Sequence, residues 1–131
     1  MDAVAQTPEG DAHIAAMADL TFGLDPITRC IIAELNGEPV GYLAYYFGVW
    51  EVDIGLRVVS LFVRQRARRL GAGRALMAEA GQIGAERGAK VLHWLVWKKN
   101  PGAIAFYRSL GGEPFDEDII MTLPIDNVSG K

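Results

Sequence analysis

Hydrophobic and polar positions alternate along this chain in a way that marks where strands should lie. Apolar stretches bounded by turn residues predict strands over residues 28–35, 39–49, 56–63, 91–97 and 119–123. Asn36-Gly37 stands between the first two stretches, and this pair predicts a tight hairpin. The stretch 91–97 is apolar almost throughout, so we expect it to be a central strand that is covered on both faces.

Two helices are expected between and after the later strands. Residues 71–87 have a helical period and end before Gly88, a residue suited to a helix C-terminus. The positions that share one face of this helix are Ala72, Leu76, Ala80, Ile83 and Arg87. Residues 101–110 predict a shorter helix that Gly111 ends.

The 131 residues suit one domain with a single core. Residues 1–27 contain a predicted helix that Thr7 caps and Pro8 opens. Residues 28–123 hold the strands and both later helices, and residues 124–131 are a tail that we expect to fray. Strands that precede and flank two helices predict the α/β class, more narrowly α+β, with a mixed sheet.

The most distinctive stretch joins the third expected strand to the helix that follows it. Leu61-Phe62-Val63 ends the strand, residues 64–69 carry four arginines, and Gly71-Ala72-Gly73 opens an alanine-rich helix. Backbone N–H groups at a helix N-terminus lack partners within the helix and lie at the positive end of its dipole. Glycine lets an anion approach the backbone closely, so this stretch predicts a phosphate or pyrophosphate site.

Two common phosphate loops do not match this stretch. A Walker A loop needs Lys followed by Ser or Thr where this chain has Arg74-Ala75. A dinucleotide fingerprint needs a third glycine where this chain has Leu76. The site must therefore take its phosphate ligand in another way.

The loop resembles the acyl-CoA loop of the GCN5-related N-acetyltransferases, whose pattern is Q/R-x-x-G-x-G/A. Arg68, Gly71 and Gly73 fill that pattern. Residues 100–112 resemble the family's later block, N-x-x-A-x-x-F-Y-x-x-x-G, and Asn100 lies 27 residues after Gly73. The similarity covers roughly residues 29–123 and looks closest to the diamine, spermidine/spermine-type branch.

The resemblance implies a fold and a reaction. The fold would be a mixed, mostly antiparallel sheet in which strands 56–63 and 91–97 are parallel neighbours that splay apart around the pantetheine arm of acetyl-CoA. The reaction would be direct attack of a small-molecule amine on the thioester, with Tyr107 protonating the departing thiolate. The residues that match the family's cofactor-binding positions are Leu61, Phe62, Val63, Arg68, Arg69, Leu70, Gly71, Ala72, Gly73, Arg74 and Asn100.

The chain departs from the diamine branch at the expected base. A Glu-Asp pair commonly precedes the strand end in that branch, whereas this chain has Val59-Ser60. Glu51 or Asp53 could supply a base through water, but solvated loop acids are the plainer reading of both. Tyr107 has a structural alternative too, as a core aromatic residue beside Phe106.

Two further departures concern the acceptor and the assembly. Lys98-Lys99 stands where polyamine enzymes tend to place acids, which favours a neutral or acidic acceptor. Alternatively, the two lysines are ordinary surface residues or contact a CoA phosphate. The N-terminal part before residue 28 is shorter than the family's usual one, so the acceptor site is either open or closed by a second subunit. Because dimers are common in the family, we expect a homodimer.

Charge and composition narrow the partners. The net charge is −3, yet residues 57–108 carry a formal +9 against −12 for the remainder, which suits a polyanion such as CoA. The lone Cys30 and the missing basic-then-apolar leader predict a cytoplasmic protein with a buried structural thiol. No apolar run is long enough to span a membrane. The spacing of the His, Cys, Asp and Glu residues does not suit a metal site, and we interpret His93 as a structural histidine.

Two alternatives to an enzyme stay open. A non-catalytic acyl-CoA-binding regulatory module would account for the missing carboxylates. A nucleic-acid-binding domain would use the basic stretch, although the acidic overall balance and the lack of a recognised motif speak against it.

Overall fold

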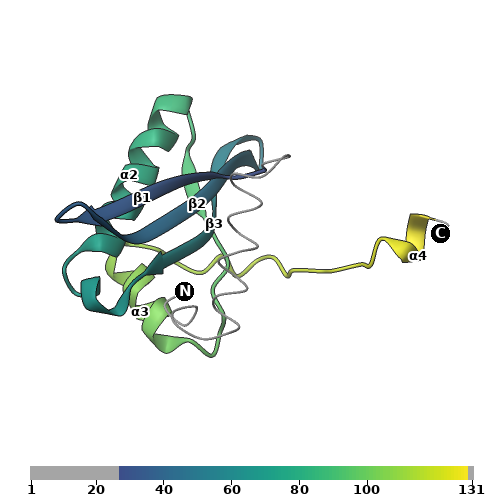
Figure 1. The fold of residues 1–131 in the computed structure, drawn as a ribbon. Coiled ribbons are helices and arrows are strands. Elements are labelled where there is room, and N and C mark those ends of the chain that lie inside the picture. Colours follow the sequence, from purple (N-terminus) through teal and green to yellow (C-terminus); the bar gives the residue numbers. More distant parts are fainter. Residues whose placement is uncertain (1–26, 130–131) are drawn as a thin grey trace.

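The computed structural model describes residues 27–129, so the helix predicted from Pro8 onward, together with His13, lies outside the described residues. The elements of the described part, shown in Figure 1, are β1 (Arg29–Leu35), β2 (Glu38–Trp50), β3 (Asp53–Val63), η2 (Gln65–Ala67), α2 (Ala72–Arg87), β4 (Val91–His93), α3 (Pro101–Ser109) and α4 (Asp126–Ser129).

The sheet has the order β1-β2-β3-β4, with β1, β2 and β3 antiparallel and β4 parallel to β3. Asn36 and Gly37 join β1 to β2 with φ values of 53° and 80°, the left-handed pair that a tight hairpin of this kind requires. The hairpin and the mixed sheet with flanking helices confirm the predicted fold class.

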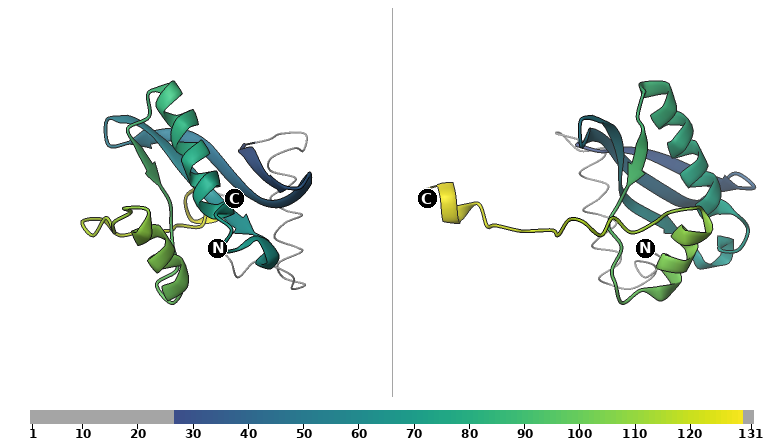
Figure 2. Two further views of the ribbon diagram at one scale, coloured as in Figure 1. Left: turned by 90° about the vertical axis from the view of Figure 1, so that its left-hand side faces the viewer. Right: turned by 180° about the vertical axis from the view of Figure 1, so that it is seen from behind.

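Helix α2 covers one face of the sheet, as the two views in Figure 2 show. Its buried residues Leu76, Met77 and Ala80 join the core that also contains Leu43 of β2 and Leu56 of β3. Burying a leucine or methionine side chain in this way stabilises the fold by roughly 1.5–3 kcal/mol. The helix ends at Gly88, whose φ of 86° is the left-handed conformation predicted for it.

An irregularity in β3 separates two strands that begin side by side. Tyr45 of β2 faces Val58 and Ala44 faces Ser60, which leaves Val59 as an extra residue, a β-bulge. The last parallel pair between β3 and β4 is Arg57 with His93, two residues before the bulge. Beyond this point β3 continues to Val63 without β4 beside it, so the two strands separate as the resemblance implied.

Two strand predictions were wrong. The strand expected over residues 91–97 pairs only at Val91–His93, and it lies at the sheet edge rather than at the centre. The strand expected over residues 119–123 does not form, and its apolar side chains are exposed. The two errors have one cause, since a strand exists only through a partner. Residues 119–123 do not pair, and no strand lies beside the outer edge of β4 in the described part of the chain.

The chain after α3 leaves the body of the molecule. Phe115 packs edge-on against Trp50, with the ring centroids 5.1 Å apart. The following residues extend away from the sheet, as Figure 1 shows, and end in the single turn of α4, which buries no residue. We call residues 116–129 the C-terminal arm. None of the described helices is long and apolar enough to cross a membrane.

Candidate active site

The loop between β3 and α2 has a strained, compact shape. Arg69 and Gly71 have φ values of 68° and 87°, so two of its residues are left-handed within three positions. Ala67 is buried, and Arg68 Nε donates to the backbone oxygen of Val63 over 3.0 Å. These contacts hold the loop against the end of β3, which places the start of α2 beside the point where β3 and β4 have separated.

The N-terminus of α2 is open to a ligand. Gly71 is the N-cap residue; no side chain caps the helix, and its first turn holds no acidic residue. The first helical hydrogen bond runs from Ala75 N to Gly71 O at 2.9 Å, so the amides of Ala72, Gly73 and Arg74 precede it. Amides in this position, together with the helix dipole, suit a phosphate group.

The two glycines of this loop have different reasons to be glycine. A Cβ on Gly71 would meet nothing within 4 Å, so only its positive φ requires glycine there. A Cβ on Gly73 would lie 3.2 Å from Phe106 Cζ of α3. We expected both glycines to serve the ligand, whereas Gly73 also lets α2 approach α3 closely.

Asn100 begins α3, the second motif. Its side-chain oxygen accepts a hydrogen bond from Ala103 N over 3.0 Å, which is the geometry of an N-cap, and Pro101 follows at the first helical position. The cap occupies the oxygen of the side chain, and the NH₂ group remains as the donor for a ligand. Ala103 is buried beneath this first turn, which fixes where Asn100 stands.

Tyr107 lies deep in the molecule rather than at its surface. Its side chain is 4% exposed and packs between Trp94, with centroids 4.8 Å apart, and Phe106 at 5.2 Å. Trp94 belongs to the segment that has left β3, so Tyr107 approaches the separated strands from α3. A tyrosine buried beside the separated strands is shielded from bulk water, which suits proton transfer to a leaving group that enters between them.

The end of β3 forms the other side of the opening between the separated strands. Leu61 and Val63 belong to the core, while Phe62 lies against Tyr42, with centroids 5.9 Å apart. Because β4 ends at His93, the backbone groups on this side of β3 beyond the bulge have no neighbouring strand among residues 27–129. They can extend a ladder of hydrogen bonds along an amide-containing chain such as pantetheine.

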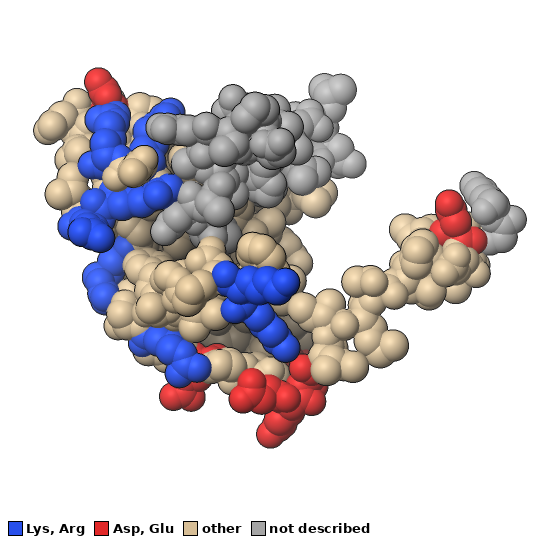
Figure 3. Space-filling model, turned by 90° about the horizontal axis from the view of Figure 1, so that it is seen from below, with Lys and Arg blue, Asp and Glu red and all other residues tan. Residues whose placement is uncertain are grey.

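Basic side chains gather along one side of the molecule, as Figure 3 shows from below. Arg74 at the start of α2 donates to Ser109 Oγ over 3.2 Å, which links the first motif to the end of α3. Lys98 and Lys99 are exposed in the turn that precedes Asn100. A cationic rim around both helix N-termini raises the local concentration of a polyanion.

Other candidate residues lie away from this region. Glu51 and Asp53 are exposed at the β2–β3 turn, and Asp53 is six strand residues, roughly 20 Å, before the bulge. This placement favours the interpretation of Glu51 and Asp53 as solvated loop acids over that of a base for the reaction. The described residues include no cluster of three His, Cys, Asp or Glu side chains that could hold a metal.

Cys30 of β1 is only partly buried, rather than buried as predicted, and His93 ends β4. Burial raises the pKa of the Cys30 thiol above its usual value, which keeps it protonated and unreactive. His93 stacks on Trp50 at 4.8 Å, and its Nδ1 lies 3.3 Å from Arg57 Nη1. Burial and then the charge of Arg57 lower the pKa of His93, so the ring is neutral near pH 7.

Comparison with known proteins agrees with this geometry. Residues 3–111 match the Acetyltransferase (GNAT) family, and the chain belongs to that family, which confirms the family predicted from the two motifs. An uncharacterized N-acetyltransferase of Methanocaldococcus jannaschii is 36% identical over 86 residues, 63% of this chain and 38% of that protein. The spermidine/spermine N(1)-acetyltransferase-like protein 1 of Homo sapiens is 31% identical over 77% of this chain and 16% of its own length.

A third relative, the thialysine N-epsilon-acetyltransferase of Caenorhabditis elegans, is 32% identical over 60% of this chain and 50% of its own length. The chain thus spans half or less of the curated relatives it matches. An integron cassette protein of Vibrio cholerae superposes with a TM-score of 0.76 at 22% identity, over 92% of this chain and 75% of its own. An aminoglycoside N-acetyltransferase in complex with CoA gives 0.70 at 18% identity, over 87% and 77% of the two chains. These two structures show the shared fold.

Proposed function

We propose that this chain is an acetyl-CoA-dependent N-acetyltransferase that transfers acetyl to the amine of a small molecule. The observation that carries the proposal is the separation of β4 from β3 at the Val59 bulge, beside the uncapped N-terminus of α2. The opening between the strands suits an extended thioester arm, and the helix N-terminus suits the pyrophosphate at the arm's other end.

The cofactor would use both motifs. The amides of the loop and of the first turn of α2, from Arg69 to Arg74, would bind the pyrophosphate, with Arg68 adding charge. The backbone of Leu61, Phe62 and Val63 would bind pantetheine along one side, and the side-chain NH₂ of Asn100 would bind it from the other. The separation of CoA into an anionic head and an amide-containing arm matches these two kinds of donor.

The reaction would be a direct transfer. The neutral amine attacks the thioester carbonyl, the C–N bond forms as the C–S bond breaks, and the amine loses its proton to water or to a group on the acceptor side. Tyr107 gives its proton to the departing CoA thiolate. The buried position of Tyr107 against Trp94 supports this role, because bulk water has little access to compete with it.

The acceptor would be neutral or acidic apart from its reacting amine. Lys98 and Lys99 are exposed in the turn before Asn100 and would repel a polycation. Under this proposal the enzyme is cytoplasmic, as the lone Cys30 of the chain favours, and acts as a homodimer.

The second candidate is a non-catalytic acyl-CoA-binding module. The observation that favours it is the lack of a carboxylate at Val59-Ser60, the positions in β3 just before the opening. Both candidates predict acetyl-CoA binding at the start of α2. Only the enzyme releases CoA thiol when an amine is supplied.

The binding site is tested by calorimetric titration of acetyl-CoA into Gly71→Asn and Gly71→Asp. Both side chains tolerate the left-handed conformation and the N-cap position, and nothing lies within 4 Å of the added Cβ, so the pair differs mainly in charge. Gly71→Asp should bind acetyl-CoA at least about tenfold more weakly than Gly71→Asn, a difference of roughly 1.4 kcal/mol. Equal affinities, or no binding to the unaltered protein at millimolar acetyl-CoA, would sink the proposal. A thiol-release screen of small amines then separates the enzyme from the module.

A further inference from the structure

Arg57 stands at the closed end of the opening between β3 and β4. It forms the last parallel pair with His93, where β4 ends while β3 continues to Val63. Val63 lies six residues, roughly 20 Å, further along β3 and leads into the loop of the proposed pyrophosphate site. A cofactor arm anchored at that loop and laid back along β3 therefore ends with its thioester beside the Arg57–His93 pair.

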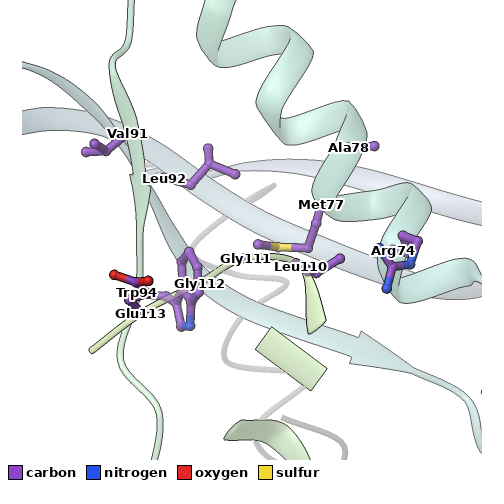
Figure 4. A pocket seen from close by; sticks show the side chains of 10 residues that line it. All are labelled: Arg74, Met77, Ala78, Val91, Leu92, Trp94, Leu110, Gly111, Gly112 and Glu113. Atoms are coloured by element: carbon purple, nitrogen blue, oxygen red, sulfur yellow. The ribbon is translucent and has the colours of Figure 1, made fainter. Parts of the chain in front are cut away.

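The two faces of the sheet differ at this point. Leu92 of β4 points toward Met77 of α2, and Trp94 lines the same groove of about 530 Å³ on the face that α2 covers (Figure 4). Trp94 stacks on Tyr107, so the proposed proton donor belongs to this face as well. Because α2 and α3 occupy this face, an amine that reaches the thioester has to approach from the opposite face.

Arg57 and His93 project from that opposite face. Leu56 and Leu92 pack on the side of α2, and successive residues of a strand alternate between the two faces, so the residue after each leucine points away from the helix. Tyr46 of β2 is the partner of Arg57 in the antiparallel register and shares its face. Its side chain is 43% exposed, so an aromatic surface lies next to Arg57 where the amine would arrive.

His93 holds Arg57 by a hydrogen bond in which the guanidinium is the donor. Nη1 of Arg57 lies 3.3 Å from Nδ1 of His93. A guanidinium has no acceptor, so Nδ1 accepts and the ring proton sits on Nε2. Nε2 is buried without a hydrogen-bond partner among residues 27–129, and stacking on Trp50 fixes the plane of the ring. His93 is therefore a positioning residue for Arg57.

Arg57 has no carboxylate partner in the part of the chain that the structure describes. The ion pair found there joins Arg66 and Glu38, and the nearest acid along β3, Asp53, lies four residues, roughly 13 Å, from Arg57. Arg57 is half-buried, and arginines that leave water are usually paired with an anion. One N–H group donates to His93, and the others keep the fork geometry that binds a carboxylate through two parallel hydrogen bonds.

We propose that the acceptor is an amino acid whose carboxylate binds to Arg57 while its amine attacks the thioester. The inference rests on the proposed function and narrows its substrate class from a small amine to an amine that carries a carboxylate. The C–N bond forms as the C–S bond breaks, the nitrogen loses its proton to water, and the CoA thiolate takes one from Tyr107. Tyr46 offers its ring to the carbon chain that joins the carboxylate to the amine. The charge on Arg57 thereby orients the reacting nitrogen.

Thiol release by the unaltered chain tests the substrate class. Glycine, alanine, phenylalanine, β-alanine, γ-aminobutyrate and ε-aminocaproate are each compared with their amides, which keep the amine and lose the negative charge. With rates expressed per neutral amine, at least one amino acid should have a kcat/KM about tenfold or more above that of its amide.

Two results would overturn the assignment. If the amides react as well as the amino acids, the N-acetyltransferase stands and only the carboxylate is wrong. If no amino acid releases thiol, the proposal fails, and the wider amine screen then decides the proposed function on its own.

Arg57→Gln assigns the carboxylate to this side chain. The variant should lower kcat/KM for the preferred amino acid about tenfold or more, change that of its amide by less than about threefold, and leave acetyl-CoA affinity unaltered. Arg57→Lys, which keeps the charge without the fork, should recover part of the loss. Arg87→Gln is the matched control, since Arg87 lies in the last turn of α2, away from the opening. Equal losses for amino acid and amide, or a loss no larger than in Arg87→Gln, would overturn the role of Arg57. The comparison of amino acids with amides needs no variant, so it holds even if Arg57→Gln does not fold.

His93→Leu and His93→Gln test whether His93 positions Arg57. Leucine cannot accept a hydrogen bond from the guanidinium, whereas the amide oxygen of glutamine can. The KM for the preferred amino acid should rise in His93→Leu and recover in His93→Gln, with the KM for its amide unchanged in both. A KM for the amino acid that His93→Leu leaves unaltered would overturn the positioning role.

Discussion

Gly73 and Phe106 hold the two sequence motifs together. A Cβ at Gly73 would lie 3.2 Å from Phe106 Cζ, closer than ordinary contact, so a methyl group there would require the Phe106 ring to shift by a few tenths of an ångström. Phe106 is next to Tyr107, and Gly73 is in the turn whose amides would bind the pyrophosphate. One contact therefore links Tyr107, the proposed proton donor, to the proposed phosphate site.

Gly73→Ala should destabilise the protein in spite of the higher helix propensity of alanine. The new methyl group must displace the Phe106 ring, and overpacking of this kind typically costs about 1–3 kcal/mol. Gly81→Ala is the control, because Gly81 lies in the same helix with nothing within 4 Å of an added Cβ, and there the change should stabilise by about 0.5–1 kcal/mol.

Urea unfolding of the two variants gives the answer directly. Opposite signs of the change in unfolding free energy support the close approach of α2 and α3. If both variants gain stability, Phe106 yields at no cost, and the contact does not fix the position of Tyr107.

Local pattern was enough to predict most of the fold. The hairpin at Asn36-Gly37, the helix that Gly88 ends and the helix that begins at Pro101 all have their signals within a few residues of the feature itself. The start of α2 at Gly71 was predictable for the same reason, whereas phosphate binding there stays a prediction. The family followed from the spacing of the two motifs.

Features that depend on distant partners were not predictable in this way. Residues 91–97 and 119–123 read as strands, but pairing decides whether a strand forms. Only Val91–His93 pairs, with β3, and residues 119–123 pair with nothing in the described part of the chain. The bulge at Val59 has no signal of its own, because it is defined by the register with Ala44 and Tyr45. The packing role of Gly73 was hidden too, since Phe106 lies 33 positions later.

Asn100→Asp should separate the two roles of Asn100. An aspartate keeps the oxygen that accepts from Ala103 N and therefore keeps the cap, but it lacks the NH₂ donor. Its stability should match the unaltered protein within about 0.5 kcal/mol, and its affinity for acetyl-CoA should fall. Asn100→Ala should lose both, with a stability cost of about 1 kcal/mol.

Thermal unfolding and acetyl-CoA titration of both variants measure the two roles independently. Undiminished affinity in Asn100→Asp would mean that Asn100 serves only as a helix cap.

Tyr107→Phe should impair turnover and leave cofactor binding intact. The variant keeps the ring between Trp94 and Phe106 and removes only the hydroxyl, so the core is preserved. Loss of a positioned proton donor typically lowers kcat by about 10²–10⁴-fold. Tyr45→Phe is the control, because Tyr45 is also buried in the core, yet belongs to β2.

Thiol release with a responsive amine gives kcat, and calorimetry gives the acetyl-CoA affinity. Equal kcat for Tyr107→Phe and Tyr45→Phe would remove Tyr107 from the mechanism and leave it as a core residue.

His93 should make the protein less stable in mild acid. Burial and then the neighbouring Arg57 lower the pKa of His93 below its ordinary value of 6.5, so the folded state favours the neutral ring. Above pH 6.5 the ring is neutral in both states, and its contribution to stability does not change. Below pH 6.5 the unfolded chain takes up a proton that the folded chain resists, so the free energy of unfolding falls until the pH reaches the folded pKa.

His93→Gln removes this titration and leaves Arg57 and Trp50 in place beside the substituted side chain. Urea unfolding at pH 7.5 and pH 5.5 should therefore show a smaller loss of stability in His93→Gln than in the unaltered protein. The comparison uses the difference between the two pH values, because the substitution also changes the stacking on Trp50. The same loss in both proteins would place the responsible group elsewhere and would mean that the Arg57–His93 contact does not resist protonation.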